Sequence, residues 1–184
     1  MSDITRRIAR LRARLAEALA RRRVPLGYVL GVGAWWLAAP TARSLAAGAA
    51  IGAIGEGLRV WAAGHLEKGR EVTSTGPYAL TRHPLYAGSI VMGAGFAVAA
   101  HSAAVTVLVL AYLAITITAA IQSEEAHLTD KFGGDYPAYR DGKASSGARG
   151  FSVARAMRNR EYRALLGFLV VLLLLAARMW HAGG

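Results

Sequence analysis

Two short segments of this sequence combine side chains that could bind a polar organic ligand and act on it. Residues 76–88 read "GPYALTRHPLYAG", and residues 122–140 read "QSEEAHLTDKFGGDYPAYR". Imidazoles and carboxylates can accept protons, and guanidinium groups can hold carboxylates or phosphates. Aromatic rings can stack on a base or face a cation. These residue types therefore predict a site for a ligand that carries both a flat ring and charged groups.

The first segment leads into an apolar run and should fix one histidine where a helix starts. Pro84 suits the first turn of a helix, and His83, which precedes it, is restricted towards extended conformations. The imidazole of His83 is therefore expected at the helix start, with Tyr86 in the first turn. Further along, Gly93 and Gly95 leave one helix face without side chains. Such a face suits close packing of another helix or close approach of a flat ligand, and both interpretations stay open.

The second segment begins where another apolar run ends. The adjacent carboxylates of Glu124 and Glu125 would emerge at the membrane boundary, where ionisable residues are usually functional. A solvated helix end is the alternative interpretation. Residues at spacings of three and four predict that this helix continues to Gly133. Beyond the glycine pair, the segment ends with Tyr136, Tyr139 and Arg140.

The elements that must position these residues are apolar runs long enough to cross a bilayer. The chain of 184 residues is 54% hydrophobic with a positive mean hydropathy, which is typical of a membrane protein. Its apolar runs cover residues 24–39, 44–64, 85–122 and 165–180. The third run is nearly twice a span, so we expect two helices joined by a tight turn at His101 and Ser102. The predicted fold is an all-α integral membrane helical bundle with about five transmembrane helices.

The basic residues orient this predicted bundle. With five spans, residues 1–23, 65–83 and 123–163 share one side and hold 8, 3 and 8 of the 22 Lys and Arg. The positive-inside rule therefore predicts a cytoplasmic N-terminus. Residues 1–23 are predicted to form a basic amphipathic helix on the inner leaflet, with a partner-binding or frayed tail as the alternative. The predominance of Arg over Lys, with abundant Ala and Gly, suggests a GC-rich bacterial genome. Together with the apolar runs, this predicts a protein of the bacterial inner (cytoplasmic) membrane.

Composition also excludes several classes of function. The net charge of +11 does not predict a nucleic-acid partner, because the basic residues alternate with apolar runs and form no stripe with interleaved aromatics. The absence of cysteine excludes disulfides, thiolate metal ligands and a cysteine nucleophile. No metal site is expected either, because no spacing brings His65, His83 and His127 to one face.

The two segments are predicted to meet at one cytoplasmic mouth. A tight turn between the third and fourth helices makes the opposite ends of those helices neighbours. The mouth would offer carboxylates for ribose hydroxyls or a cation, rings for a base or a sulfonium, and arginine for a carboxylate. Together these features fit S-adenosylmethionine, which has an adenine, a ribose, a sulfonium and an amino-acid tail.

At these residues the sequence resembles a family of integral-membrane methyltransferases, which includes isoprenylcysteine carboxyl methyltransferases and phospholipid N-methyltransferases. The resemblance covers roughly residues 52–140 and includes "GEGLRVWAAGHL" at 55–66. It implies a cytoplasm-facing S-adenosylmethionine site lined or shaped by His83, Pro84, Tyr86, Gly93, Gly95, Glu124 and Glu125, and closed by Tyr136 and Tyr139. One departure is the polar, glycine-rich "DGKASSGARGFS", where the family often continues into an apolar segment.

Methyl transfer from a sulfonium is an in-line displacement, so positioning supplies most of the acceleration. A carboxylate acceptor needs no base, whereas an amine must lose a proton, and Glu125 and His83 are the candidate bases. Arg140 or Arg82 could hold an anionic group of the substrate or cofactor. Glu56 and Arg59 could neutralise each other within the second span, or border the cavity and contact the substrate. A lipophilic acceptor would enter from the bilayer, among the membrane lipids that surround the protein.

Two other functions stay open at this stage. An NADPH-dependent membrane reductase of the sterol or steroid type has a related proline, tyrosine and glycine cluster, although the paired glutamates favour the methyl donor. A non-catalytic lipid-binding protein is the other alternative. The methyl acceptor is not specified and could be an isoprenoid carboxylate, a phospholipid amine or a small thiol. The glycines of the second span, Gly48, Gly52 and Gly55, could pack against a helix of the same chain or of a second copy, which leaves a homodimer possible. Residues 165–184 are expected to add a C-terminal helix to a core over 24–164.

Overall fold

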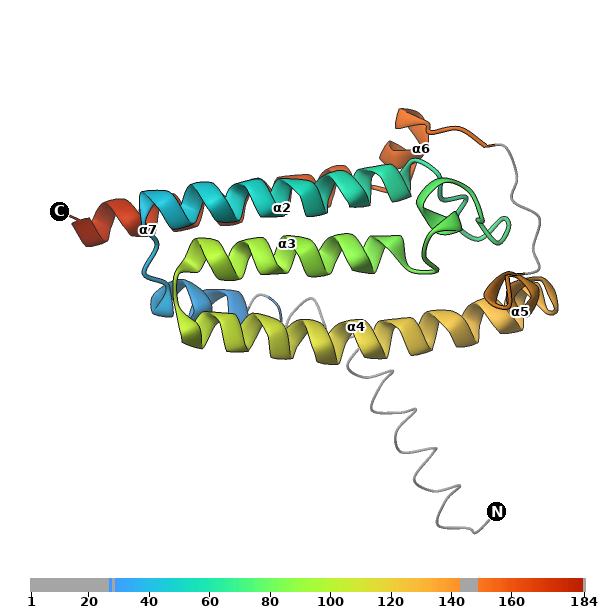
Figure 1. Ribbon diagram of the computed structural model, residues 1–184, viewed down its shortest axis with the longest axis horizontal. Coiled ribbons are helices and arrows are strands. Elements are labelled where there is room, and N and C mark those ends of the chain that lie inside the picture. The colour runs from blue at the N-terminus through green and yellow to red at the C-terminus, as the bar shows by residue number, and fades with distance from the viewer. Residues whose placement is uncertain (1–26, 28, 143–148, 184) are drawn as a thin grey trace, which may run out of the picture.

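The computed structural model describes residues 27, 29–142 and 149–183, which contain helices and no strand. Residues 29–37 are helical, and Figure 1 shows the long helices that follow lying side by side. The elements are α2 (Ala42–Ala63), η1 (Gly76–Ala79), α3 (Pro84–Ala100), α4 (Ala103–Phe132), α5 (Asp135–Arg140), α6 (Val153–Arg158) and α7 (Tyr162–Gly183). The predicted amphipathic helix over residues 1–23 and the start of the first predicted span lie outside the described residues.

Helices α2 and α3 form the tightest pair in the bundle. Thr41 caps α2 in a capping box with Ser44, whose hydroxyl also donates to the Ala99 carbonyl at 3.2 Å. A Cβ atom added to Gly95 would lie 2.5 Å from the backbone nitrogen of Gly52, and one added to Gly48 would collide with the Gly95 carbonyl. Contacts of this kind bring helix backbones together in membranes. The glycine face of α2 is therefore used for packing within the chain.

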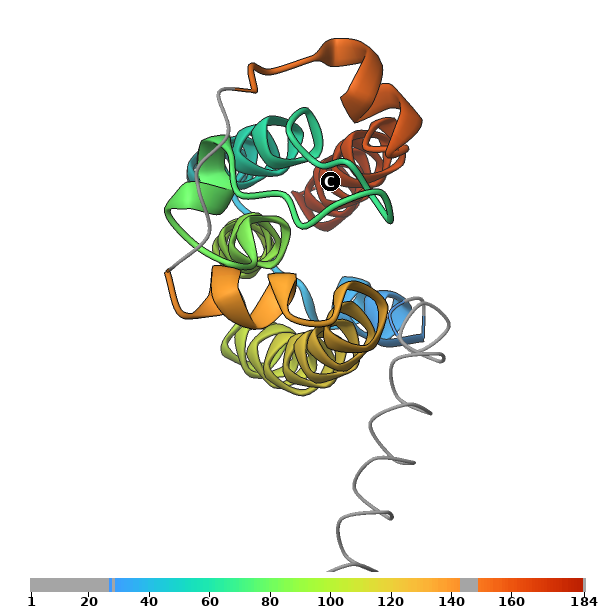
Figure 2. The ribbon, with the colours of Figure 1, turned by 90° about the vertical axis from the view of Figure 1, so that its right-hand side faces the viewer.

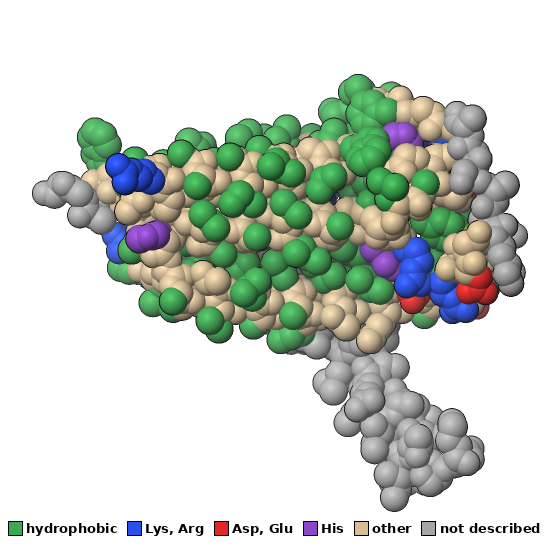
Figure 3. Space-filling view, viewed as in Figure 1, with side chains coloured by type: hydrophobic (Ala, Val, Ile, Leu, Met, Phe, Trp, Pro, Cys, Tyr) green, Lys and Arg blue, Asp and Glu red, His purple; other side chains and the backbone are tan. Residues whose placement is uncertain are grey.

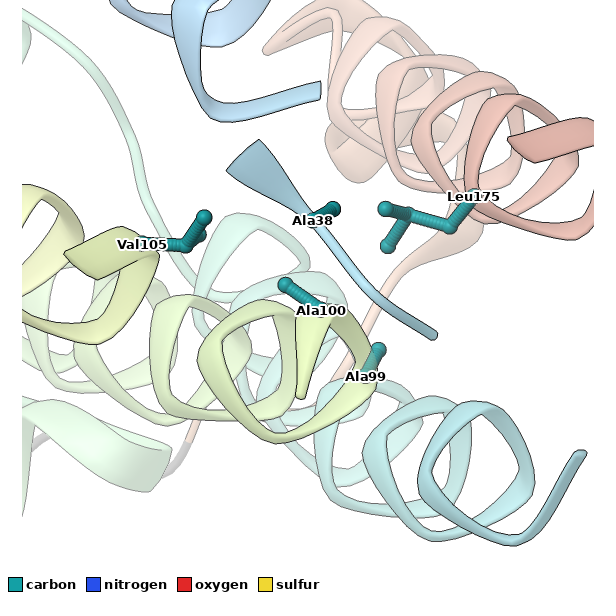
Figure 4. Packing of buried hydrophobic residues seen from close by; sticks show 5 residues of the cluster. All are labelled: Ala38, Ala99, Ala100, Val105 and Leu175. Carbon is teal, nitrogen blue, oxygen red and sulfur yellow. The ribbon is translucent and has the colours of Figure 1, made fainter. Parts of the chain in front are cut away.

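The turn between α3 and α4 lies where the sequence predicts it. His101 has the left-handed conformation with φ 48°, and the side chain of Ser102 caps α4 by accepting from the Val105 backbone nitrogen. A small hydrophobic core closes this end of the bundle around Ala38, Ala99, Ala100, Val105 and Leu175, as Figure 4 shows. The turn joins the end of α3 to the start of α4. The start of α3 and the end of α4, which carry the candidate site residues, therefore lie together at the other end of the hairpin.

Two of the described helices are long and apolar enough to cross a bilayer, namely α4 and residues Tyr162–His181 of α7. The 20 residues of the latter span about 30 Å at 1.5 Å per residue, which matches the hydrocarbon core. Helix α3 is apolar but shorter, and the count of five spans and the cytoplasmic N-terminus stay predictions. Apolar side chains cover the length of the bundle in Figure 3, while charged side chains gather at its two ends. This surface is consistent with a membrane helical protein.

The C-terminal elements are attached to α2. Asn159 donates from its side-chain amide to the carbonyls of Ala63 and Leu66, at 2.8 Å each, just where α2 ends. Helix α7 then runs back along α2, and the Phe168 ring occupies the space where a Cβ of Gly52 would lie. Phe168 also packs against Phe96 of α3, with ring centroids 5.7 Å apart. Helix α7 is therefore packed into the bundle, and Figure 2 shows it beside α2 in the end view.

Candidate active site

The start of α3 holds His83 in one place. The preceding segment turns at Gly76, which has φ 59°, and forms the short η1 helix with Pro77 at its start. His83 is the N-cap of α3, with φ −130° and ψ 58°, and Pro84 occupies the first turn. A proline in the first turn has no amide hydrogen to leave unpaired and excludes helical geometry for the residue before it. The imidazole is thus presented at the helix end, with its ring centroid 5.8 Å from that of Tyr86.

The two polar segments meet through one carboxylate. The Nε2 atom of His83 lies 3.1 Å from Oε1 of Glu125, a residue 42 positions further along the chain. The guanidinium of Arg82 lies 3.4 Å from the same oxygen. Because the carboxylate accepts from the imidazole, it can hold Nε2 in its protonated form and leave Nδ1 as the nitrogen with a free lone pair. Glu125 therefore orients His83 and sets its tautomer.

Helix α5 brings two tyrosines over the same end of the bundle. The Tyr139 hydroxyl donates to the Tyr78 carbonyl at 2.6 Å, so α5 is tied to η1. The Tyr136 ring lies beside that of Tyr139, with centroids 6.2 Å apart, and Tyr136 is only 2% exposed. Burial and the neighbouring Glu125 carboxylate raise the pKa of Tyr136 to about 12. Burial also raises the pKa of Tyr139. Both hydroxyls therefore stay protonated at neutral pH, and that of Tyr139 is already used as the donor to Tyr78.

A cavity of about 1030 Å³ lies behind these residues. It is slightly larger than the range of about 300–1,000 Å³ that is usual for small-molecule sites. Its wall along α4 is largely apolar and includes Tyr112, Leu113, Thr116, Ile117 and Ala120. Its polar part is lined by residues from the helix ends, among them Tyr78, Arg82, His83, Tyr86, Glu124, His127, Tyr136 and Tyr139. The cavity can therefore hold a polar ligand at its mouth and an apolar chain beside it.

One arginine on the cavity wall is held from several sides. Arg59 donates from Nε to Oε1 of Glu161 at 2.7 Å, and from a terminal nitrogen to the Ser89 hydroxyl at 2.5 Å. Glu56 lies one helical turn away, with an oxygen 3.8 Å from the Arg59 Nε. The ion pair between Glu56 and Arg59, which the sequence suggested, is thus longer than the ion pair between Arg59 and Glu161. Both Arg59 and Glu161 line the cavity. Glu56 is buried and does not line it.

The structure brings most of the predicted site residues to this cavity, but not all. Those that line it are Arg59, Arg82, His83, Pro84, Tyr86, Glu124, Tyr136 and Tyr139, and Glu125 lies directly behind His83. Arg140 is exposed and pairs with Asp141 at 3.4 Å outside the cavity lining. Gly93 and Gly95 lie in helix contacts, because added Cβ atoms would collide with Leu113 of α4 and with the α2 backbone. The cofactor roles suggested for these three residues stay predictions.

Sequence reasoning missed many residues of the cavity wall, and two of them make contacts that hold the site together. Tyr78 is buried, lines the cavity and supplies the carbonyl that holds Tyr139. Its place in "GPYAL", eight positions before Tyr86, was the available signal. Glu161 is the second, and its only signal was a single carboxylate among the arginines of "RAMRNREYR". Among the described residues, no group of three His, Asp or Glu side chains could hold a metal ion.

Comparison with known proteins identifies the family. The sequence profile of the phospholipid methyltransferase family, PEMT, matches residues 25–135, which is more than half of the 184-residue chain. No curated protein and no solved structure matches the chain. The match contains His83, the paired glutamates and all of α2, α3 and α4. The chain therefore belongs to the phospholipid methyltransferase family.

Proposed function

We propose that the protein transfers a methyl group from S-adenosylmethionine to a lipophilic, membrane-associated acceptor. The observation that carries the proposal is the contact between His83 and Glu125 at the polar part of a cavity of about 1030 Å³. Family membership supports methyl transfer, and the mixed polar and apolar lining supports a polar cofactor beside a lipophilic substrate. The proposal also places the site on the cytoplasmic side of the membrane, as the distribution of Lys and Arg predicts.

The residues of the cavity fit the proposed cofactor. The hydroxyl of Tyr136 is buried beside the Glu125 carboxylate and makes no hydrogen bond of normal geometry within the described residues, so it can donate to Glu125 or to a ligand. Tyr78, Tyr86 and Tyr139 add aromatic rings that suit an adenine or a sulfonium. The Glu124 carboxylate lines the same space and can accept hydrogen bonds from ribose hydroxyls. These residues would hold the cofactor, which supplies an electrophilic methyl group on sulfur.

The chain's own residues would then position the acceptor and manage its proton. His83 can accept a proton at Nδ1, while Glu125 stabilises the imidazolium through the contact at Nε2. This base is needed for an amine acceptor and not for a carboxylate. Arg82, which also contacts Glu125, lies where it can hold an anionic group at the mouth. The apolar α4 wall would receive the tail of a substrate that arrives from the bilayer.

Binding of S-adenosylhomocysteine to the detergent-purified full chain tests the proposal. We expect a rise in unfolding temperature and saturable binding, and loss of both in the Tyr136→Phe and His83→Ala variants. Asp130→Asn is a matched control, because Asp130 is exposed on α4, one turn beyond the site, and does not line the cavity. Stabilisation by NADPH but not by S-adenosylhomocysteine would refute the proposal in favour of a reductase.

Incorporation of a labelled methyl group identifies the acceptor. Membranes that contain the protein are incubated with a deuterated methyl donor, and lipid extracts are analysed by mass spectrometry. We expect label in a lipid or isoprenoid fraction. For an amine acceptor, Glu125→Gln should reduce the label at least tenfold, because the base would lose its orientation. Unchanged labelling in both Glu125→Gln and His83→Ala would exclude the proposed roles of these residues.

A further inference from the structure

Helix α6 exposes an apolar face although it lies beside charged residues. Val153 and Met157 are 66% and 54% exposed, whereas Ala156 between them is buried. Three residues separate this helix from Tyr162, where the part of α7 that is long and apolar enough to cross a bilayer begins. Figure 2 shows α6 at the outside of the bundle, away from α4. Apolar side chains in this position suit the boundary between lipid headgroups and acyl chains.

A second and smaller pocket lies beneath α6. Its volume is about 260 Å³, and it is lined by Leu66, Glu67, Lys68, Arg70, Arg155, Arg158 and Asn159. Four of these side chains are cationic and one is a carboxylate, so the pocket carries an excess of positive charge. It adjoins the large cavity, with which it shares the wall formed by Leu66, Glu67, Lys68 and Asn159.

The single carboxylate is already occupied by one of the arginines. Glu67 accepts from Arg155 Nε at 2.8 Å, and this hydrogen bond holds the pKa of Glu67 below its usual value. Arg155 also donates to the carbonyls of Gly64 and Gly150, at 2.5 and 3.1 Å, so its position is fixed. Arg158 and Arg70 lie 3.5 and 4.0 Å from Glu67, and their side chains are largely exposed. Two guanidinium groups are thus left with donors free for an anion.

We propose that this pocket binds the phosphate of an anionic phospholipid from the leaflet that contacts α6. Guanidinium groups match phosphate oxygens in geometry, and the pocket is too small for more than a headgroup. The acyl chains would lie against Val153 and Met157 and continue along α7. A free phosphate would use the same guanidinium groups but would gain nothing from these apolar side chains. The site does not depend on the proposed methyl transfer.

Lipid retention tests this proposal in the full chain. The protein is purified in neutral detergent, and binding of short-chain phosphatidylglycerol is measured by native mass spectrometry, with phosphatidylcholine and inorganic phosphate as comparison ligands. The test variant carries Arg70→Gln and Arg158→Gln, which remove two of the three cations that line only this pocket. The third, Arg155, is kept because it is bound to Glu67 and to two backbone carbonyls. The control variant carries Arg160→Gln and Arg163→Gln, which remove the same charge from exposed residues just outside it.

We expect the wild-type protein to bind phosphatidylglycerol more tightly than either comparison ligand. The test variant should lose about fivefold in affinity for each charge removed, whereas the control variant should stay within about twofold. Equal losses in the two variants, or no loss in the test variant, would overturn the proposal. Saturation by inorganic phosphate with the same affinity would also overturn it, because the lipid chains would then contribute nothing. Unchanged unfolding temperatures without lipid establish that both variants are folded.

Discussion

The ion pair between Arg59 and Glu161 should contribute substantially to stability, and Glu161→Gln tests this. The pair joins α2 to the start of α7 across 102 residues of sequence, and Glu161 is only 7% exposed. Removing one partner of a buried ion pair costs about 3–5 kcal/mol. Arg59 keeps the Ser89 hydroxyl at 2.5 Å and Glu56 at 3.8 Å, so part of its charge stays compensated. We therefore expect a loss of about 2 kcal/mol, within the range of about 1.5–3 kcal/mol for a hydrogen bond to a charged group.

Unfolding in mild detergent measures this loss. For a chain of this length, about 2 kcal/mol corresponds to a fall in unfolding temperature of roughly 4–8 °C. Glu71→Gln is the control, because Glu71 pairs with Arg149 at an exposed position and such pairs contribute about 1 kcal/mol or less. A double-mutant cycle with Arg59→Gln isolates the coupling. If Glu161→Gln costs no more than Glu71→Gln, or the cycle gives no coupling, the reasoning is wrong.

Three further perturbations test other parts of the structure. Gly95→Ala should destabilise the protein by about 1–3 kcal/mol through collision with the α2 backbone, whereas Gly57→Ala, which meets no atom within 4 Å, should not; thermal unfolding compares the two. Tyr139→Phe removes the 2.6 Å bond between α5 and η1, so we expect weaker binding of S-adenosylhomocysteine and a stability loss of about 1 kcal/mol, measured by calorimetry. The pair of Glu67 with Arg155 should stabilise the fold above pH 4.5, since the folded-state pKa of Glu67 is lowered. This contribution should disappear as the pH falls through that lowered pKa, and unfolding curves of Glu67→Gln should lack this part of the acid sensitivity.

Local sequence rules were sufficient to predict the helix ends that carry the site residues. Pro84 fixes the start of α3, and the polar break at His101 and Ser102 fixes the turn into α4. Once these two helices form a hairpin, the segments that carry His83 and Glu125 become neighbours, and this convergence could be expected from a single sequence. The direct contact between the two side chains depends on how the helices face each other and is seen only in the structure.

Contacts that depend on which helix packs beside which could not be expected in the same way. The pairing of Arg59 with Glu161 requires α7 to run back along α2, and no periodicity in either segment specifies that neighbour. The glycines at 93 and 95 are a second case, because open space on a helix face suits a ligand or a backbone equally well. In the structure, backbone and side-chain atoms of α2 and α4 lie opposite those glycines.

The glycine contact between α2 and α3 determines which parts of the protein can move. Backbones this close cannot slide past one another without atomic overlap, so the two helices behave as one rigid wall. Space for a ligand to enter or leave is therefore expected on the other side, where α4 is followed by α5 beyond the pair Gly133 and Gly134. Stiffening Gly133 should then slow ligand exchange while it leaves the contact between α2 and α3 unchanged.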